Sequence, residues 1–238
     1  MKIIVLRSTV YKEKDYIYDA IANDGYLSFK VRGGASNNSK YLWLNNPLTV
    51  ADVEFIDDGR YKYPVLKEAM LISSPISGID SFDYLSSVSV VQEVATSMIQ
   101  DEEKHLLFND LDSSLTALRN KKDSLLVLLI LLAKAMRITG SELEVDKCVY
   151  CGATKEIVTF SFAEGGFVCR KCFEKGMENE LAPSQMKLIR YAFRAVNYSC
   201  VNSEQFSLDD KKVVLRAFKE YIYDFLGVDL KSINYLIK

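Results

Sequence analysis

Four cysteines stand in two pairs whose spacing is typical of a metal site. Two residues separate Cys148 from Cys151, two separate Cys169 from Cys172, and 17 lie between the pairs, so the pattern is C-x2-C-x17-C-x2-C. Two thiolates three positions apart on a tight turn can both reach one metal ion at about 2.3 Å, and two such turns complete a tetrahedron. The pattern therefore predicts a zinc site with four sulfur ligands.

The same cysteines could instead form two disulfides, a redox-active pair or buried free thiols. The N-terminal segment MKIIVLRSTVYKEKDY has no apolar secretory signal, and thiols in the cytosol stay reduced, which disfavours disulfides. A redox-active C-x-x-C needs one pair, usually in a βαβ pattern that is not visible here. Four thiolates would fill the coordination shell and leave no position for water, so we expect the zinc to be structural. The fifth cysteine, Cys200, is expected to be a small buried apolar residue.

The composition is that of an ordinary folded protein, because 49% of the 238 residues are apolar and 26% are charged. The longest apolar run, residues 125–133, is much shorter than the roughly 20 residues that cross a bilayer, so we expect a cytoplasmic protein without a membrane partner. The formal net charge is -2. Any site for a polyanion must therefore be a local patch.

The first 75 residues or so have the pattern of short strands separated by turns. Leu27, Phe29 and Val31 alternate with polar residues, which indicates a strand with one buried face. The segments predicted as strands are 1–10, 16–22, 26–32, 41–44, 48–56 and 63–73. About five strands in this length favour a small closed barrel, and we assign it to residues 1–76.

After Pro75 the apolar residues recur at helical spacing. We expect helices over 82–103, 106–119 and 124–138, a fourth beginning near Pro183, and a fifth beginning at Ser207 and ending at Gly227. The cysteine module occupies about 145–180. The predicted fold is therefore α+β, with the barrel followed by an all-α helical domain, 77–238, that carries the cysteine module as an insertion.

No set of residues indicates catalysis. The chain has a single histidine, His105, and neither G-x4-G-K-[ST] nor G-x-G-x-x-G, the two phosphate-binding glycine motifs. We therefore predict that the protein is not an enzyme.

Basic and aromatic residues are interleaved in the N-terminal region, as in barrels that hold single strands with cations on phosphates and rings on bases. The candidate DNA-binding residues are Lys12, Lys14, Lys30, Arg32 and Lys40. Alternatively, the rings belong to the core and the cations only keep the barrel soluble.

A second basic row lies at i, i+3 and i+7 of a predicted helix and consists of Lys187, Arg190 and Arg194. Lys212, Arg216 and Lys219 make a similar row. Exposed helices often carry such rows for solubility alone.

The order of these features resembles the RecO family of bacterial recombination mediators. The residues that carry the resemblance are 10–15, Gly25, 31–35, Gly140, 148–152, Phe160, Phe162, Gly165, Gly166, 169–172, Leu226, Gly227 and 230–232.

The resemblance implies an N-terminal OB-fold barrel and a helical domain with a four-cysteine zinc-ribbon-like insertion. It implies a protein of DNA repair and recombination that binds single- and double-stranded DNA, anneals strands without nucleotide hydrolysis, and associates with the nucleoid. The implied partners are RecR, the acidic C-terminal tail of the single-strand-binding protein SSB, and indirectly RecA, which is loaded onto SSB-coated strands. The row Lys187, Arg190 and Arg194 is the candidate site for the SSB tail.

Two other functions remain open at this point. One is a zinc-dependent enzyme that processes nucleic acid, and the other is a scaffold that binds only proteins.

Overall fold

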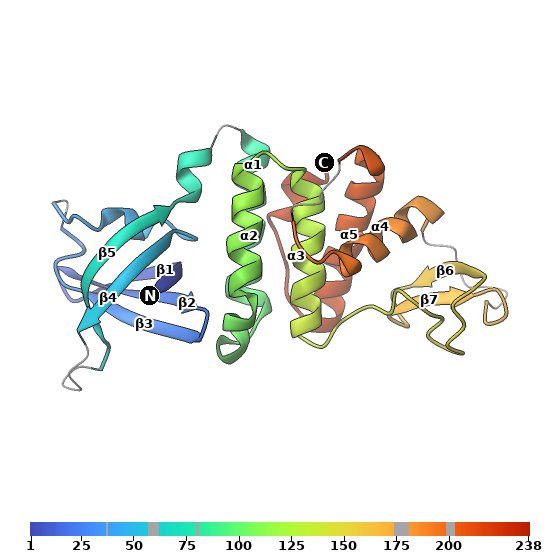
Figure 1. Cartoon of the computed structure of the whole chain (residues 1–238), viewed down its shortest axis with the longest axis horizontal. Helices are drawn as coiled ribbons and strands as arrows, with labels where there is room; N and C mark the ends of the chain where they lie inside the picture. The colour runs from blue at the N-terminus through green and yellow to red at the C-terminus, as the bar shows by residue number, and fades with distance from the viewer. Residues whose placement is uncertain (37, 57–61, 80, 174–180, 199–202) are drawn as a thin grey trace.

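The computed structural model describes residues 1–36, 38–56, 62–79, 81–173, 181–198 and 203–238. A β-barrel forms one end of the molecule, helices form the middle, and a small two-stranded hairpin forms the other end (Figure 1). The barrel, the helical region and the hairpin that carries the cysteines confirm the predicted fold class. Cys200 lies outside the described residues.

The barrel consists of β1 (Lys2–Tyr11), β2 (Asp15–Ala22), β3 (Gly25–Val31), β4 (Val50–Ile56) and β5 (Val65–Ser73). The order around the barrel is β1-β2-β3-β5-β4. It closes through antiparallel pairing of β1 with β4 and a single parallel pair between Lys30 of β3 and Val65 of β5. Tyr18 and Phe29 stack inside at 5.4 Å between ring centroids, which confirms the buried face predicted for β3.

One predicted strand, residues 41–44, is wrong. The chain there forms the short 3-10 helix η1 (Leu42–Asn45). Its backbone groups bond locally, because the Leu44 amide donates to the Tyr41 carbonyl at 2.9 Å and the Asn46 amide to the Trp43 carbonyl at 3.3 Å. Leu44 is fully buried in the barrel core, so the apolar residues that suggested a strand instead cover the barrel interior.

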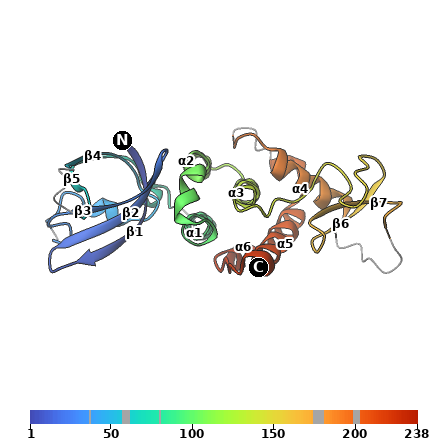
Figure 2. The ribbon, with the colours of Figure 1, turned by 90° about the horizontal axis from the view of Figure 1, so that it is seen from below.

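The helical region consists of α1 (Phe82–Glu93), α2 (Phe108–Arg119), α3 (Ser124–Ile138), α4 (Pro183–Arg194), α5 (Leu208–Leu226) and α6 (Ile233–Leu236). Helix α3 lies between α1 and α2 on one side and α4 and α5 on the other (Figure 2). Its residues 125–133 are all buried, as a central helix requires. The bounds predicted for α3 are confirmed.

The caps predicted for α5 are also confirmed. The Ser207 hydroxyl accepts a hydrogen bond from the Asp210 amide at 3.1 Å, and Gly227 ends the helix with φ of 68°. Such a positive φ is the conformation that favours glycine at a helix end.

The predicted helix over residues 82–103 is wrong beyond Met98, and its α-helical part ends at Glu93. A single π-helical turn, η3 (Val94–Met98), follows α1, Ile99 is extended, and a 3-10 helix, η4 (Asp101–Leu107), precedes α2. The 3-10 segment contacts the barrel. The Lys104 ammonium lies 5.2 Å from the centre of the Tyr26 ring on β3, while it also binds Asp101.

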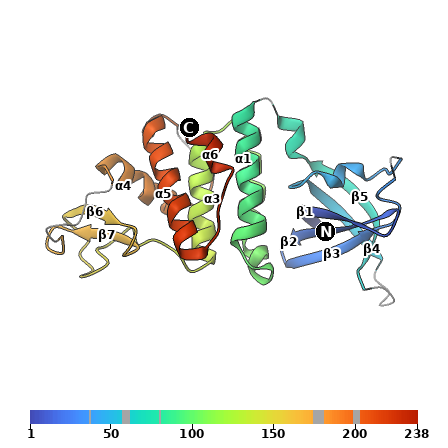
Figure 3. The same cartoon turned by 180° about the vertical axis from the view of Figure 1, so that it is seen from behind.

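The barrel and the helices share one apolar core. Five buried barrel residues belong to the same cluster as the buried faces of α1, α2 and α3: Ile4, Leu6, Ile21, Leu48 and Val50. A salt bridge of 2.6 Å between Lys2 of β1 and Asp112 of α2 spans the same junction. Figure 3 shows α1 beside the barrel from behind.

No helix among the described parts of the chain combines the length and apolar character needed to span a bilayer.

The shared core predicts different effects for two buried valines of β4. Val50 belongs to the shared cluster, and Val53 belongs to the cluster inside the barrel that Trp43 contacts. Each change to alanine should cost about 2 kcal/mol. Val50→Ala should lower the urea midpoint of both the helical circular dichroism and the fluorescence of Trp43, the only tryptophan. Val53→Ala should lower the fluorescence midpoint more than the helical one. A helical midpoint unmoved by Val50→Ala would contradict the shared core.

Candidate metal centre and nucleic-acid interface

The four cysteines of the motif converge at one end of the molecule. Their sulfur atoms all lie within 4.8 Å of one another. The sulfurs of Cys151 and Cys169 are 3.6 Å apart, close to the ~3.8 Å edge of a tetrahedron with metal–sulfur bonds of 2.3 Å. Cys148 and Cys169 are buried, whereas Cys151 is exposed. The geometry of this donor set therefore fits a single tetrahedral metal ion.

Each cysteine pair lies on a turn closed by its own backbone. The Gly152 amide donates to the Cys148 carbonyl at 2.9 Å, and Gly152 has φ of 73°. In the second turn the amides of Cys172 and Phe173 both donate to the Cys169 carbonyl at 3.0 Å. These closed turns present the sulfurs of each pair on one side, as a shared metal ion requires.

Two of the four thiols differ in pKa. Burial raises the pKa of the Cys148 thiol, but amides of Cys169, Cys151 and Tyr150 directed at its sulfur outweigh burial and lower that pKa to about 6. The hydrogen bond of Cys172 to Cys151 is the main cause that raises the pKa of Cys172 to about 12. A bound divalent cation would displace the protons of the cysteine thiols.

The two cysteine turns are held together by the hairpin β6 (Ile157–Ser161) and β7 (Gly166–Cys169). Glu144 bridges to Gly166, and its carbonyl accepts the Phe167 amide at 3.0 Å. A Cβ atom on Gly166 would lie 2.5 Å from the Glu144 carbonyl oxygen and 2.8 Å from a methyl of Val149. Gly166 is therefore required for the close approach of β7 to Glu144 and to Val149 of the first cysteine turn, which explains the glycine before the second cysteine pair.

The basic residues of the barrel gather at the end away from the helices. Lys12 and Lys14 lie in the turn between β1 and β2, Lys30 is near the end of β3, and Arg32 follows it. The Ala35 amide donates to the Lys14 carbonyl at 3.0 Å, so the loop after β3 lies against this turn. Among the described residues Lys12 and Lys14 form no ion pair. The structure thus brings four of the five predicted residues together.

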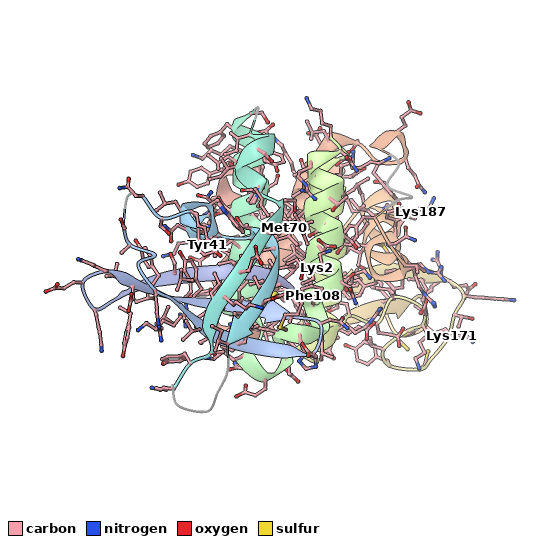
Figure 4. All side chains as sticks on the ribbon, turned by 60° about the vertical axis from the view of Figure 1, so that its left-hand side comes forward. Lys2, Tyr41, Met70, Phe108, Lys171 and Lys187 are labelled. Carbon is pink, nitrogen blue, oxygen red and sulfur yellow. The ribbon has the colours of Figure 1, made fainter. Side chains whose placement is uncertain are left out.

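Lys40, the fifth, lies just before η1. Its ammonium lies 4.8 Å from the centre of the Tyr41 ring, which raises the pKa of Lys40 through their hydrogen bond. Tyr41 is labelled on the barrel side in Figure 4.

Sequence reasoning missed the residue that organises the cluster, Asp15 at the start of β2. Its carboxylate binds the Lys30 ammonium at 2.7 Å and accepts the Gly33 amide at 2.9 Å. The bond from Lys30, followed by the Gly33 amide and the charge of Arg32, holds the pKa of Asp15 below its ordinary value despite partial burial. Nothing in the local sequence identifies these partners, because they lie more than a dozen positions away.

One ring in this region is well exposed. Tyr11 is 38% exposed, and the ammonium groups of Lys12 and Lys30 lie 5.5 and 5.2 Å from its ring centre. Tyr16, Tyr41 and Trp43 pack on the barrel core instead, and Tyr26 packs on the core shared with the helices. The alternative, that the rings belong to the core, therefore holds for these four but not for Tyr11.

Two of the three cations in the predicted row on α4 bind an acidic residue. Arg190 and Arg194 both bind Asp146, at 3.3 and 3.0 Å, and these bonds, that of Arg194 first, lower the pKa of Asp146. Lys187 and Arg190 line a hollow of about 310 Å³ between α4 and the β6–β7 hairpin. Its other lining residues are largely apolar: Ile157, Val158, Phe167, Pro183 and Met186, with Thr154 and Asp146. Arg194 lies outside this hollow.

The row on α5 binds the end of the chain. Lys212 and Arg216 donate to the carbonyls of Lys238 and Ile237, and Lys219 binds Asp229 at 3.1 Å. These cations therefore have structural partners.

Comparison with known proteins agrees with this arrangement. Residues 80–233 match the family model described as Recombination protein O C terminal. The chain is 24% identical over 236 residues to the DNA repair protein RecO of Bacillus pumilus, with 98% of this chain and 91% of that protein covered. The DNA repair protein RecO of Bacillus subtilis is 24% identical over 237 residues, covering 98% and 91%. That of Mycoplasma mycoides is 23% identical over 244 residues, covering 99% and 96%.

The family model spans well over half of the chain, and the relatives align with nearly all of it, from the barrel through the cysteine module to the last helix. The chain therefore belongs to the RecO family.

Proposed function

We propose that this protein is a DNA repair mediator of the bacterial cytoplasm and nucleoid that binds and anneals single-stranded DNA, also contacts duplex DNA, and uses no nucleotide hydrolysis. With RecR it would help to load RecA onto SSB-coated strands. The observation that supports this most is the cluster of Lys12, Lys14, Lys30 and Arg32 around the exposed Tyr11 ring, in a chain whose relatives are named as DNA repair proteins.

The barrel would hold the strand at this end. In OB-fold barrels the face of the second and third strands and the loop between the first two bind oligonucleotides. Here η4 contacts β3 and its Lys104 covers Tyr26, so the free part of that face is the end that bears Tyr11 and Lys30. Ammonium groups would hold phosphates while a base stacks on Tyr11. Neutralised phosphates would then allow two strands to approach and pair.

We further propose that residues 1–76 act as the DNA-binding domain and residues 77–238 as a helical domain with the module at about 145–180. Zinc bound to Cys148, Cys151, Cys169 and Cys172 would have a structural role, because four sulfur ligands leave no position for a reactive water.

The DNA site is tested by charge reversal. Lys30→Glu/Arg32→Glu should weaken binding of a fluorescent single-stranded oligonucleotide at low salt by at least about 10-fold and reduce the salt slope by about 2, because two phosphate contacts are lost. Fluorescence anisotropy measures both. The control is Lys122→Glu/Lys231→Glu, which changes the net charge equally at two exposed lysines outside the barrel. Equal affinity of the two double variants would exclude this site.

The metal site is tested by removing one ligand. Cys151→Ser should lose the single equivalent of zinc and lower the melting temperature, because binding of a structural metal contributes directly to folding free energy. Cys200→Ser, outside the motif, should keep the metal. Metal analysis and thermal unfolding measure the two effects. A Cys151→Ser protein with one equivalent of zinc and an unchanged melting temperature would refute the structural role.

The hollow beside α4 is the proposed site for the SSB tail, since an apolar floor with the cations Lys187 and Arg190 at its rim complements an acidic, aromatic peptide. Arg194 would act beside it, through the Asp146 carboxylate it shares with Arg190. Arg190→Ala/Arg194→Ala should weaken binding of a tail peptide several-fold in calorimetry. Lys212→Ala/Arg216→Ala removes two cations of the other row and should bind normally. If both double variants bound like the unchanged protein, the assignment would be wrong.

A further inference from the structure

We propose that Asp15 is a positioning residue of the barrel site: its carboxylate, although it repels phosphate, holds Lys30 and the loop after β3 in the arrangement that receives the strand. This inference rests on the proposed DNA site. It assigns a favourable role in DNA binding to an acidic residue whose charge alone would be expected to weaken that binding.

The bonds of Asp15 join two segments that are distant in sequence. One carboxylate oxygen binds the Lys30 ammonium at 2.7 Å, and the other accepts the Gly33 amide at 2.9 Å. Both side chains of the pair are mostly shielded, with 18% of Asp15 and 20% of Lys30 exposed. Asp15 also pairs with Tyr11 across the β1–β2 hairpin. Asp15 therefore links β1, which carries the Tyr11 ring, through strand pairing and β3, which carries Lys30, through its carboxylate.

The first consequence concerns the side chain of Lys30. A free lysine loses rotamer freedom when it binds a phosphate, and that loss reduces affinity. Here the Lys30 ammonium is held between the Asp15 carboxylate and the Tyr11 ring, 5.2 Å from the ring centre. Much of the loss of rotamer freedom of the Lys30 side chain has therefore already occurred on folding. The three donors of an ammonium leave it able to bind a phosphate while it keeps the carboxylate.

The second consequence concerns the backbone. Gly33 has φ of 64°, and its amide donates a hydrogen bond to the Asp15 carboxylate. Gly34 lies so close to Val31 and Tyr16 that a Cβ there would meet atoms of both at 3.2 to 3.3 Å. These contacts turn the chain sharply after β3. Arg32, whose charge acts on Asp15, is carried on this turn.

Two physical effects of Asp15 on DNA binding have opposite signs. As a negative charge among Lys12, Lys14, Lys30 and Arg32, it lowers the local positive potential, so that its neutralisation would strengthen binding of a polyanion. As a positioning group, it orders the cations, so that its neutralisation would weaken binding. The direction of the change in affinity therefore decides between the two.

The test compares two acidic residues close in sequence, Glu13 in the β1–β2 turn and Asp15 at the start of β2. Asp15→Asn keeps the shape of the side chain and should weaken binding of a single-stranded oligonucleotide about threefold to tenfold at low salt, although the protein becomes more positive. Glu13→Gln makes the same change of charge at an exposed residue and should bind equally or more tightly. Anisotropy measures the affinities, and Trp43 fluorescence in urea shows that each barrel is folded.

A double-mutant cycle tells positioning from general damage. If Asp15 acts through Lys30 and through the loop that carries Arg32, Asp15→Asn should have little further effect in a Lys30→Ala/Arg32→Ala protein. An equal loss in both backgrounds, or an Asp15→Asn protein that binds as well as the unchanged protein or better, would overturn the inference. Normal binding by Lys30→Ala and by Lys30→Glu/Arg32→Glu would instead remove the proposed DNA site itself.

Discussion

The burial of β1 on both of its faces is the constraint on which the rest of the structure depends. Ile3 and Val5 point into the barrel, while Ile4 and Leu6 belong to the core shared with the helices. A strand buried on both faces is apolar at consecutive positions rather than at alternate ones, which explains the run of four apolar residues. The first half of β1 is buried against the helices and the barrel interior, whereas the end of the β1–β2 hairpin is exposed to solvent. That exposed end carries the basic cluster.

At the opposite end of the molecule a metal ion would have the organising role that the apolar core has at the barrel. Phe160 and Phe167 of the β6–β7 hairpin pack into the core of the helical region, whereas the cluster around the sulfurs consists of Val168 with Cys148 and Cys169. So small a cluster supplies little hydrophobic stabilisation, and a structural metal commonly compensates for this. The hairpin in turn forms one wall of the hollow beside α4, whose exposed Lys187 is labelled in Figure 4 together with Lys171 of the module. A metal ion that fixes the hairpin would therefore also fix one wall of that hollow.

Two carboxylates order the basic residues of both regions. Asp15 holds Lys30 at the barrel, and Asp146 holds Arg190 and Arg194 at the module. In each case a carboxylate from one segment binds cations from another, so that the cations have defined positions instead of moving freely in solvent. This arrangement is consistent with a net charge of only -2 in a protein that we expect to bind polyanions. Local order, more than total charge, distinguishes its basic surfaces.

The sequence by itself determined the features that depend on neighbouring residues. The cysteine spacing predicted a cluster that the fold confirms, the apolar run of α3 predicted a central helix, and Ser207 and Gly227 predicted both ends of α5. Each of these signals acts within a turn or two of chain. Only the tertiary structure decided the 3-10 helix at Leu42–Asn45, the interruption after Glu93 and the partners of Asp15 and Asp146. The physical reason is that these features involve long-range contacts, namely packing in the barrel interior, the contact of Lys104 with Tyr26 of β3, and ion pairs between residues distant in sequence. The local pattern contains none of these contacts.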